Sequence, residues 1–245
     1  MKASDFNAKY YDKNYFVTPE GKKFHNADGK ELGWSYNNPE GEFLGAGPIA
    51  QAWATIFKPK NMLDVGCGRG TFVAYARKAG IEAHGFDFSE FATSEEGKYA
   101  GCEKGWLKCH DASKPWPYPD NHFDLVTCLD LFEHIYEEDL PQVINEMFRV
   151  AKKWVFIQIC TVNGQEGYTL GKKESVPIEL EGMAVAGHVC IKPEYWWNYR
   201  FYKNEWLPRK VMTERFISLV DNNIISNWIR NSILVFEKDI DGSGE

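Results

Sequence analysis

The stretch that decides the fold is Asn-Met-Leu-Asp-Val-Gly-Cys-Gly-Arg-Gly, residues 61–70. It begins with a short apolar run and ends in three glycines, and residues 71–80 (TFVAYARKAG) then follow with helical spacing. Glycines permit a tight turn and bring backbone N–H groups close to a ligand, and a helix N-terminus favours an anionic group. The stretch therefore predicts a strand, a glycine-rich turn and a helix that together hold an anionic part of a ligand.

The same alternation of strand and helix continues along the chain. An amphipathic helix is expected at 139–151 and another at 192–204, and two further strands are expected at 214–220 and 231–237. The remaining strand candidates are 81–88, 105–110, 123–129 and 154–160. This order predicts an α/β fold: a Rossmann-like, seven-stranded, mostly parallel sheet with helices on both faces.

Two segments fall outside this pattern. Residues 1–50 are rich in aromatic side chains and are expected to form an N-terminal lid over a Rossmann-like, ligand-binding domain at 51–240. Residues 161–190 lack a clear period and predict an inserted loop on the substrate side, after the fifth strand. Hydrogen exchange that slows when cofactor binds would identify the first segment as a lid.

Composition narrows the classes of partner and compartment. The formal net charge of −7 indicates no broad basic surface, so nucleic acid is not the expected partner. The six cysteines are dispersed without a CxxC pair, and no apolar run approaches the roughly 18 residues of a membrane helix. The opening residues also lack a signal-peptide pattern, which predicts a cytoplasmic protein.

Acidic residues at successive strand ends indicate the ligand. Asp87 lies 23 residues after Asp64 (87 − 64 = 23), where a Rossmann carboxylate accepts hydrogen bonds from both ribose hydroxyls. Asp111 follows the third strand, where it can accept from an adenine amino group while Ala112 packs on the ring. The order favours adenosine linked to an amino acid, as in S-adenosyl-L-methionine (SAM), over a pyrophosphate ligand.

These residues resemble the class I SAM-dependent methyltransferases, in particular the group with an Asp/Glu-x-x-Glu-His motif after strand four, which includes ubiquinone-pathway O-methyltransferases. The matching stretches are MLDVGCGRG (62–70), GFDFS (85–89), HDA (110–112), FDLVTCLDLFEHI (123–135) and GHV (187–189). The resemblance implies that SAM binds and is converted to S-adenosyl-L-homocysteine (SAH), with cofactor contacts at Asp64, Gly66, Gly68, Asp87, Phe88, Asp111, Ala112 and Leu129.

The catalytic candidates follow the fourth strand, because ligands of open α/β sheets lie beyond the carboxyl ends of the strands. Asp130, Glu133 and His134 lie at spacings that place them on one side of a helical turn, and the resemblance adds His188. His134 and His188 are candidate general bases with an imidazole pKa near neutral, and Glu133 supports the site. Bracing of the site without proton transfer is the alternative.

A divalent metal is the less favoured use of the same residues. Asp130, Glu133, His134 and His188 offer carboxylate and imidazole ligands suited to Mg²⁺, Mn²⁺ or Zn²⁺. The expected reaction is methylation of a hydroxyl on a small molecule or glycan. Methylation of RNA or protein, and SAM binding without catalysis, are the alternatives.

Overall fold

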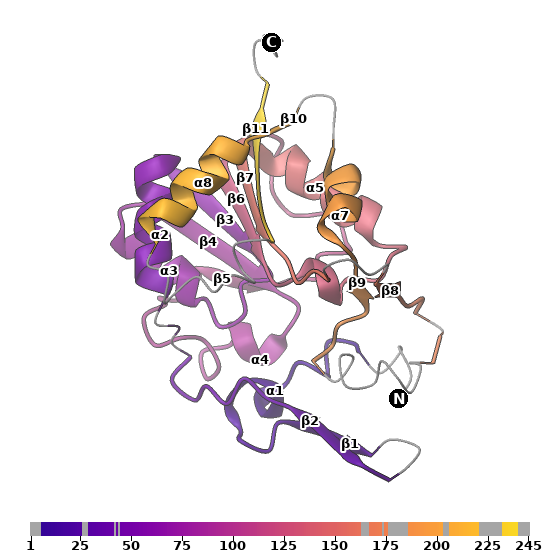
Figure 1. Cartoon of the computed structure of the whole chain (residues 1–245). Coiled ribbons are helices and arrows are strands. Elements are labelled where there is room, and N and C mark those ends of the chain that lie inside the picture. Colours follow the sequence, from indigo (N-terminus) through magenta and orange to yellow (C-terminus); the bar gives the residue numbers. More distant parts are fainter. Residues whose placement is uncertain are drawn as a thin grey trace.

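The structure is a computed structural model that describes residues 6–25, 29–41, 43, 45–162, 167–172, 174–175, 186–202, 206–220 and 232–239. A seven-stranded sheet forms its centre, with strand order β10-β11-β7-β6-β3-β4-β5 (Figure 1). Its members are β3 (Asn61–Val65), β4 (Glu82–Asp87), β5 (Leu107–Cys109), β6 (Phe123–Leu129), β7 (Ala151–Gln158), β10 (Trp206–Pro208) and β11 (Ile233–Lys238).

Strands β5, β4, β3, β6 and β7 run parallel, β11 pairs antiparallel with β7, and β10 pairs antiparallel with β11 at the edge of the sheet. Because β3 lies between β4 and β6, the chain leaves β3 toward one side of the sheet and returns to the other. The carboxyl ends of β3, β4 and β6 therefore meet at a topological switch point, where open α/β sheets bind their ligands. This arrangement confirms the predicted Rossmann-like fold.

The seventh strand comes from a different place than the sequence predicted. Residues 214–220 lie in helix α8 (Lys210–Leu219) and its C-cap, and β10 at Trp206–Pro208 supplies the missing strand. The prediction was wrong because the apolar residues of this stretch were assigned a strand period. Thr213, Phe216 and Val220 are buried at intervals of three and four residues, which is the spacing of one helix face.

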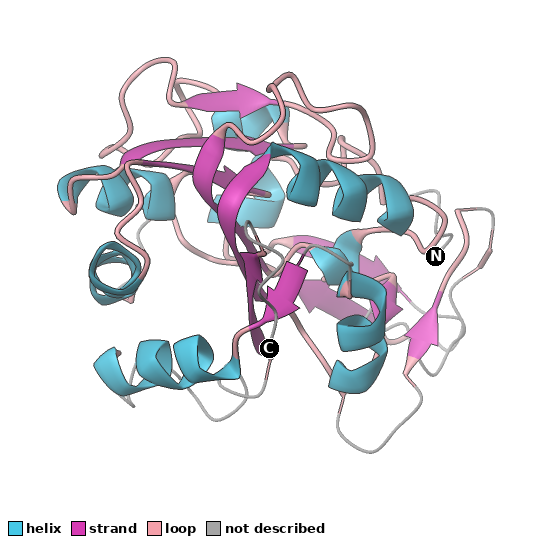
Figure 2. Ribbon diagram, turned by 90° about the horizontal axis from the view of Figure 1, so that it is seen from above, coloured by secondary structure: helices cyan, strands magenta, loops and turns pink. Residues whose placement is uncertain are grey.

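Helices cover both faces of the sheet (Figure 2). One face carries α2 (Ala46–Ile56), α3 (Thr71–Lys78) and α8, whose Trp53, Val73 and Phe216 share a core with the sheet. The other carries α5 (Leu140–Val150) and α7 (Glu194–Phe201), whose Met147 and Trp197 belong to a second core. Both sides of the central strands are thus removed from water, as the unbroken apolar runs of β6 and β7 require.

The N-terminal segment lies outside the sheet. It contains α1 (Lys13–Val17) and a hairpin of β1 (Lys22–His25) with β2 (Glu31–Trp34), and it leads into α2 (Figure 1). Phe6, Tyr10, Tyr15 and Phe16 are buried in a third core with residues of the main domain. The segment therefore packs on the domain through its own aromatic side chains.

The described parts of the predicted insertion form a short ribbon. Strand β8 (Tyr168–Thr169) pairs with β9 (Cys190–Ile191), and α7 follows within the predicted helix 192–204. Residues 163–166, 173 and 176–185 of the insertion lie outside the described residues. Among the residues that the structure describes, none forms a helix long and apolar enough to cross a membrane.

Candidate functional site

The glycine-rich turn connects β3 to α3. Gly66, Gly68 and Gly70 have φ angles of 72°, 51° and 83°, in the left-handed region that glycine adopts at little cost. A Cβ on Gly70 would also lie 2.7 Å from the Leu107 side chain, so that position lacks room for one. The turn thus has the tight conformation that the three glycines predicted.

Asp87 closes this turn from the end of β4. Its Oδ2 accepts a hydrogen bond from the Gly68 backbone N–H, and its Oδ1 accepts one from Ser89, both at 2.8 Å. Burial raises the pKa of the carboxyl group, and the N–H groups of Ser89, Gly68 and Phe88 lower it. Each carboxylate oxygen has a second lone pair, so Asp87 can hold the turn and still accept hydrogen bonds from a ligand.

A cavity of about 440 Å³ opens beside the turn. Asp111 borders it and accepts a hydrogen bond from the Ser113 backbone N–H at 2.8 Å. The sequence-predicted cofactor residues that line this first cavity are Gly66, Gly68, Asp87, Phe88, Asp111, Ala112 and Leu129. The structure therefore brings seven of the eight predicted residues to one cavity.

Asp64, the eighth, lines a second cavity of about 260 Å³ on the other side of the turn. Its side chain is buried, with 2% of the residue exposed, and its Oδ1 accepts a hydrogen bond from the Thr127 hydroxyl at 2.7 Å. Burial raises the pKa of Asp64 to about 7, against the lowering effect of Thr127. A cation bound beside this carboxyl group would favour its ionised form.

The two cavities meet above the ends of β3 and β6. The second also contacts apolar side chains from the helical face, among them Phe72 and Phe216, and the amide of Gln158 at the end of β7. The residues that line both cavities are Phe16, Tyr36, Gly66, Gly68, Leu129 and Asp130. We call this shared wall the junction.

Aromatic residues of the N-terminal segment close the first cavity. Tyr11 and Tyr15 line it together with the junction residues Phe16 and Tyr36. The Tyr15 hydroxyl donates to the Ala186 carbonyl at 3.0 Å, and the Ser89 hydroxyl donates to the Tyr11 carbonyl. The N-terminal rings that the sequence singled out thus include several that face the cavity.

A second set of contacts ties the end of the segment to the glycine-rich turn. The Arg69 guanidinium donates to the carbonyls of Asn38 at 2.6 Å and Pro39 at 3.1 Å. The Thr71 hydroxyl donates to the Gly41 carbonyl. We call these contacts the latch, because they join residues 38–41 to the turn that lies between the two cavities.

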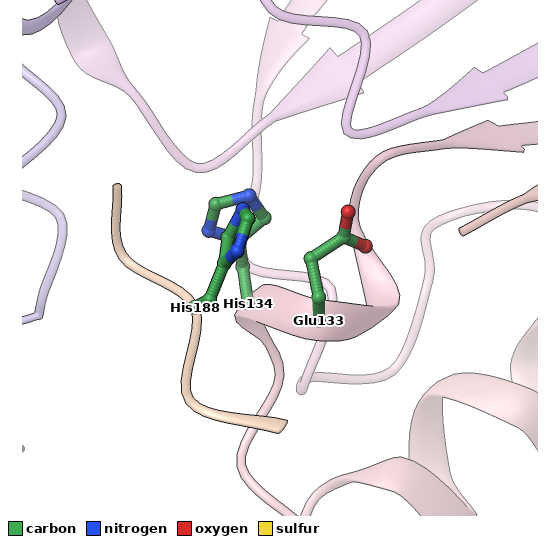
Figure 3. Close-up of side chains that lie close together, drawn as sticks. All are labelled: Glu133, His134 and His188. Carbon is green, nitrogen blue, oxygen red and sulfur yellow. The ribbon is translucent and has the colours of Figure 1, made fainter. Parts of the chain in front are cut away.

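His134 and His188 are close together, although they are distant in the sequence. His134 ends the 3-10 helix η2 (Phe132–His134), His188 lies near the end of the insertion, and their ring centroids lie 4.8 Å apart (Figure 3). Only His134 is among the residues that line the first cavity, and its Nδ1 lies 3.4 Å from the Tyr11 hydroxyl. The predicted convergence of the two imidazoles is present, with His188 behind His134.

Both imidazoles are neutral over most of the pH range. Burial, together with the neighbouring His188, lowers the pKa of His134 to about 3, and burial lowers that of His188 to about 4. The expectation of an imidazole pKa near neutral is therefore wrong. A short motif reveals residue type and spacing, but the burial of a side chain depends on tertiary packing.

Glu133 lies under the junction rather than in a cavity. It is 1% exposed, and its Oε1 accepts from the Cys160 backbone N–H at 3.2 Å. Burial and the charge of Asp130 raise its pKa well above the ordinary value. One oxygen of its carboxyl group lies within 4.8 Å of a ring nitrogen of each of the two imidazoles (Figure 3). Burial therefore favours the protonated form of Glu133.

The residues do not fit a divalent cation as they stand. The ligand atoms of Glu133, His134 and His188 lie within 4.8 Å of one another, and Asp130 is not part of this set. Two ligands held at about 2.1 Å by one ion are at most roughly 4.2 Å apart. The described side chains thus form a looser group than a metal centre, and no metal is assigned.

Gln158 and Tyr136 also line the cavities and were missed from the sequence. Gln158 is the last residue of β7, so its place at the carboxyl edge of a predicted strand was the signal that could have identified it. Tyr136 lies just beyond the Glu-His motif, and no spacing rule marks it.

Comparisons with known proteins agree with this geometry. Residues 63–157 match a family described as a methyltransferase domain. The norajmaline N-methyltransferase of Rauvolfia serpentina is 38% identical over 105 residues, which cover 38% of this chain and 33% of that protein. The ubiquinone biosynthesis O-methyltransferase of Thiobacillus denitrificans is 29% identical over 150 residues, 55% of this chain and 62% of that protein.

A solved structure extends the likeness over more of the chain. The plantazolicin methyltransferase BpumL, in complex with a pentazolic desmethylPZN analogue and SAH, has a TM-score of 0.54 at 15% identity. The match covers 83% of this chain and 87% of that one, and at this identity it shows the fold alone. The chain spans less than two thirds of the length of the curated relatives named above. The matched domain, the sheet topology and the strand-end residues agree with a class I SAM-dependent methyltransferase domain.

Proposed function

We propose that this protein transfers the methyl group of SAM to a hydroxyl group of a small molecule or glycan. The observation that supports the proposal is the first cavity, which runs from Asp87, Phe88 and Asp111 to Asp130 and His134. SAM would place its adenosine against the first three and its sulfonium over Gly66, Gly68 and Leu129. The acceptor would then approach from the side of the N-terminal aromatic rings.

The proposed cofactor contacts follow the chemistry of each side chain. Asp87 accepts from the ribose hydroxyls, Asp111 from the adenine amino group, and Phe88 and Ala112 pack against the adenine ring. Asp64 sits beside the turn where a bound ammonium group would lower its raised pKa. The N–H groups of the turn and the N-terminus of α3 favour the carboxylate of the methionine part.

A nitrogen acceptor is the second candidate, because relatives of this chain include N-methyltransferases and because carboxyl groups surround the junction. Asp130 belongs to the junction, and Asp87 and Asp64 each line one of the two cavities. The basic lining residues Arg69, Lys114 and Lys172 lie outside the shared wall. A protonated amine would be attracted to such a site but must lose its proton before it accepts methyl. The net charge of −7 does not favour an RNA acceptor.

The proposed activity is tested in two steps. Calorimetric titration with SAM and SAH measures cofactor binding, and transfer of labelled methyl from SAM is then measured on matched pairs of phenols and anilines, sugars and amino sugars, and RNA. Transfer to hydroxyl compounds is the expected result. Transfer to the amine of each pair would establish the second candidate, and binding of SAM without any transfer would indicate a non-catalytic protein.

A cytoplasmic location stays a prediction.

We further propose that residues 6–41 act as a lid over the cofactor. Bound SAH should slow backbone hydrogen exchange in this segment at least about tenfold, because the rings of Tyr11, Tyr15 and Tyr36 gain a partner. Arg69→Ala should speed exchange at residues 38–41 in the free protein by removing part of the latch, and Arg215→Ala, on the exposed side of α8, serves as the control. Equal exchange with and without SAH would mean a permanently docked segment.

A further inference from the structure

The junction contains one acidic side chain that faces both cavities. Asp130 follows β6, has a left-handed backbone (φ 48°) and lines the first and the second cavity. Its backbone N–H donates to the Gln158 carbonyl at 2.9 Å, which fixes the residue across the ends of β6 and β7. Aspartate is among the few residues other than glycine that adopt this conformation readily. The backbone thus directs a carboxyl group at the point where the cavities meet.

Buried polar groups that lack a full set of partners surround Asp130. Gln158 is 5% exposed and lines the second cavity; its amide lies against Asp130, yet Nε2 has no hydrogen-bond partner of good geometry among the described residues. Glu133 Oε2 is likewise buried without such a partner. A buried amide N–H without an acceptor is costly, so its position beside a cavity points to a ligand atom that accepts from it.

Asp130 and Glu133 form a pair of neighbouring carboxyl groups. The interaction between the two carboxyl groups lowers the pKa of Asp130 and raises that of Glu133. Repulsion between neighbouring carboxylates disfavours the ionisation of both groups at once. Glu133 has no access to either cavity, whereas Asp130 faces both.

His134 and His188 are poorer candidates than Asp130 for accepting a proton from the methyl acceptor. With a pKa of about 3, His134 is a weak base, and its Nδ1 faces the Tyr11 hydroxyl. His188 reaches neither cavity among the described lining residues. Asp130 is exposed to both cavities, where a ligand can reach it, and desolvation by the surrounding protein raises the pKa of its carboxyl group.

We propose that Asp130, which faces both cavities, is the general base of the methyl transfer, and that Glu133 beneath it is a positioning residue that orients Asp130. This inference rests on the proposed function. The acceptor O–H lies between Asp130 and the sulfonium of SAM, and the Gln158 amide donates to the acceptor oxygen. As that oxygen attacks, the new C–O bond forms while the S–CH₃ bond breaks, the sulfonium becomes the neutral thioether of SAH, and the acceptor proton moves to Asp130.

The groups that face Asp130 set the pH dependence. They are Glu133 from η2, Cys128 from β6 and Cys160 after β7, whose pKa values burial raises, and Tyr36 from the N-terminal segment, which is 50% exposed. None of these four groups is positively charged. Turnover should therefore fall as the pH drops through the raised pKa of Asp130. The acid limb, which is the acidic side of the plot of kcat against pH, should reflect the ionisation of Asp130 alone.

Turnover measurements on an acceptor from the screen test the proposal. Asp130→Asn, which suits the same backbone conformation, should lower kcat about 100-fold or more while SAH affinity changes less than about threefold. Glu133→Gln should retain most activity, since a carboxamide also donates to Asp130, whereas Glu133→Leu should lower kcat and move the acid limb to higher pH. Asp120→Asn, an exposed surface carboxylate, is the matched control. Unchanged kcat in Asp130→Asn would overturn the proposal.

A titration of the SAH complex tests the dyad without any acceptor. Carboxyl ¹³C resonances of Asp130 and Glu133, assigned with the Asn and Gln variants, are followed from pH 4 to 9. Glu133 should stay protonated at pH 7 while Asp130 titrates above the usual aspartate range. An ionised Glu133 at pH 7 would contradict the dyad even if SAM binding and methyl transfer stand, and absence of SAH binding would instead contradict the proposed function.

Discussion

Asp87→Ala should weaken SAM binding by about 2–3 kcal/mol, which is roughly 30- to 150-fold in Kd. The loss has two causes, because the side chain is the proposed acceptor for the ribose hydroxyls and also accepts from the Gly68 N–H at 2.8 Å. Without it, the glycine-rich turn loses the contact that holds it against β4. Calorimetric titration with SAM measures the change.

Two further variants separate these causes. Asp87→Asn keeps one acceptor oxygen, so it should preserve either the turn contact or the ribose contact and lose less affinity than alanine. Asp120→Ala removes an exposed carboxylate paired with Arg149, and it should leave SAM affinity unchanged. If Asp87→Ala binds SAM as tightly as the unaltered protein, the assignment of the first cavity to the cofactor is wrong.

The free energy of unfolding should fall steeply in mild acid because of two partly buried histidines, His134 and His188. Their pKa values are about 3 and about 4 in the folded protein, against about 6.5 in an unfolded chain. Above pH 6.5 both states hold neutral imidazoles, and stability is full. Between pH 6.5 and 4 only the unfolded chain takes up these protons, so each histidine removes up to about 1.4 kcal/mol per pH unit.

Urea unfolding at pH 7, 6, 5 and 4.5 checks this slope. The His134→Gln, His188→Gln double variant should show a flatter pH dependence than the unaltered protein, and His122→Gln, which removes an exposed histidine, should not. Asp64 acts in the opposite sense, since its pKa of about 7 lowers stability as the pH rises from about 4 to 7. Comparison of the variants cancels that contribution. Equal slopes would mean that the imidazoles are hydrated in the folded state.

Local patterns were enough to predict the cofactor side of the site. Gly66, Gly68, Asp87 and Asp111 follow strands whose order the chain alternation predicts, and parallel strands bring their carboxyl ends to one edge. The spacing of Glu133 and His134 placed them after β6 in the same way. These features depend on few residues that are close in sequence.

The remaining features depend on packing between distant segments. A strand and a helix of ten residues can have a similar content of apolar residues. The sequence of residues 214–220 therefore does not distinguish the two, and the burial of Phe216 against the sheet is what marks a helix. The pKa values of His134 and His188 depend on the burial that each receives, and the donor at Gln158 matters only because Asp130 lies beside it. None of these relations is encoded in a short motif.

The junction sets a rule for the design of inhibitors. A molecule that fills both cavities must pass along Gly66, Gly68 and Tyr36 of the junction, where the glycines offer backbone atoms and no side chain. Its central part gains little selectivity there and should be slim and positively charged, to suit Asp130. Its two ends would supply selectivity: a flat ring against Phe88 in the larger cavity, and a compact apolar group against Phe216 in the smaller one.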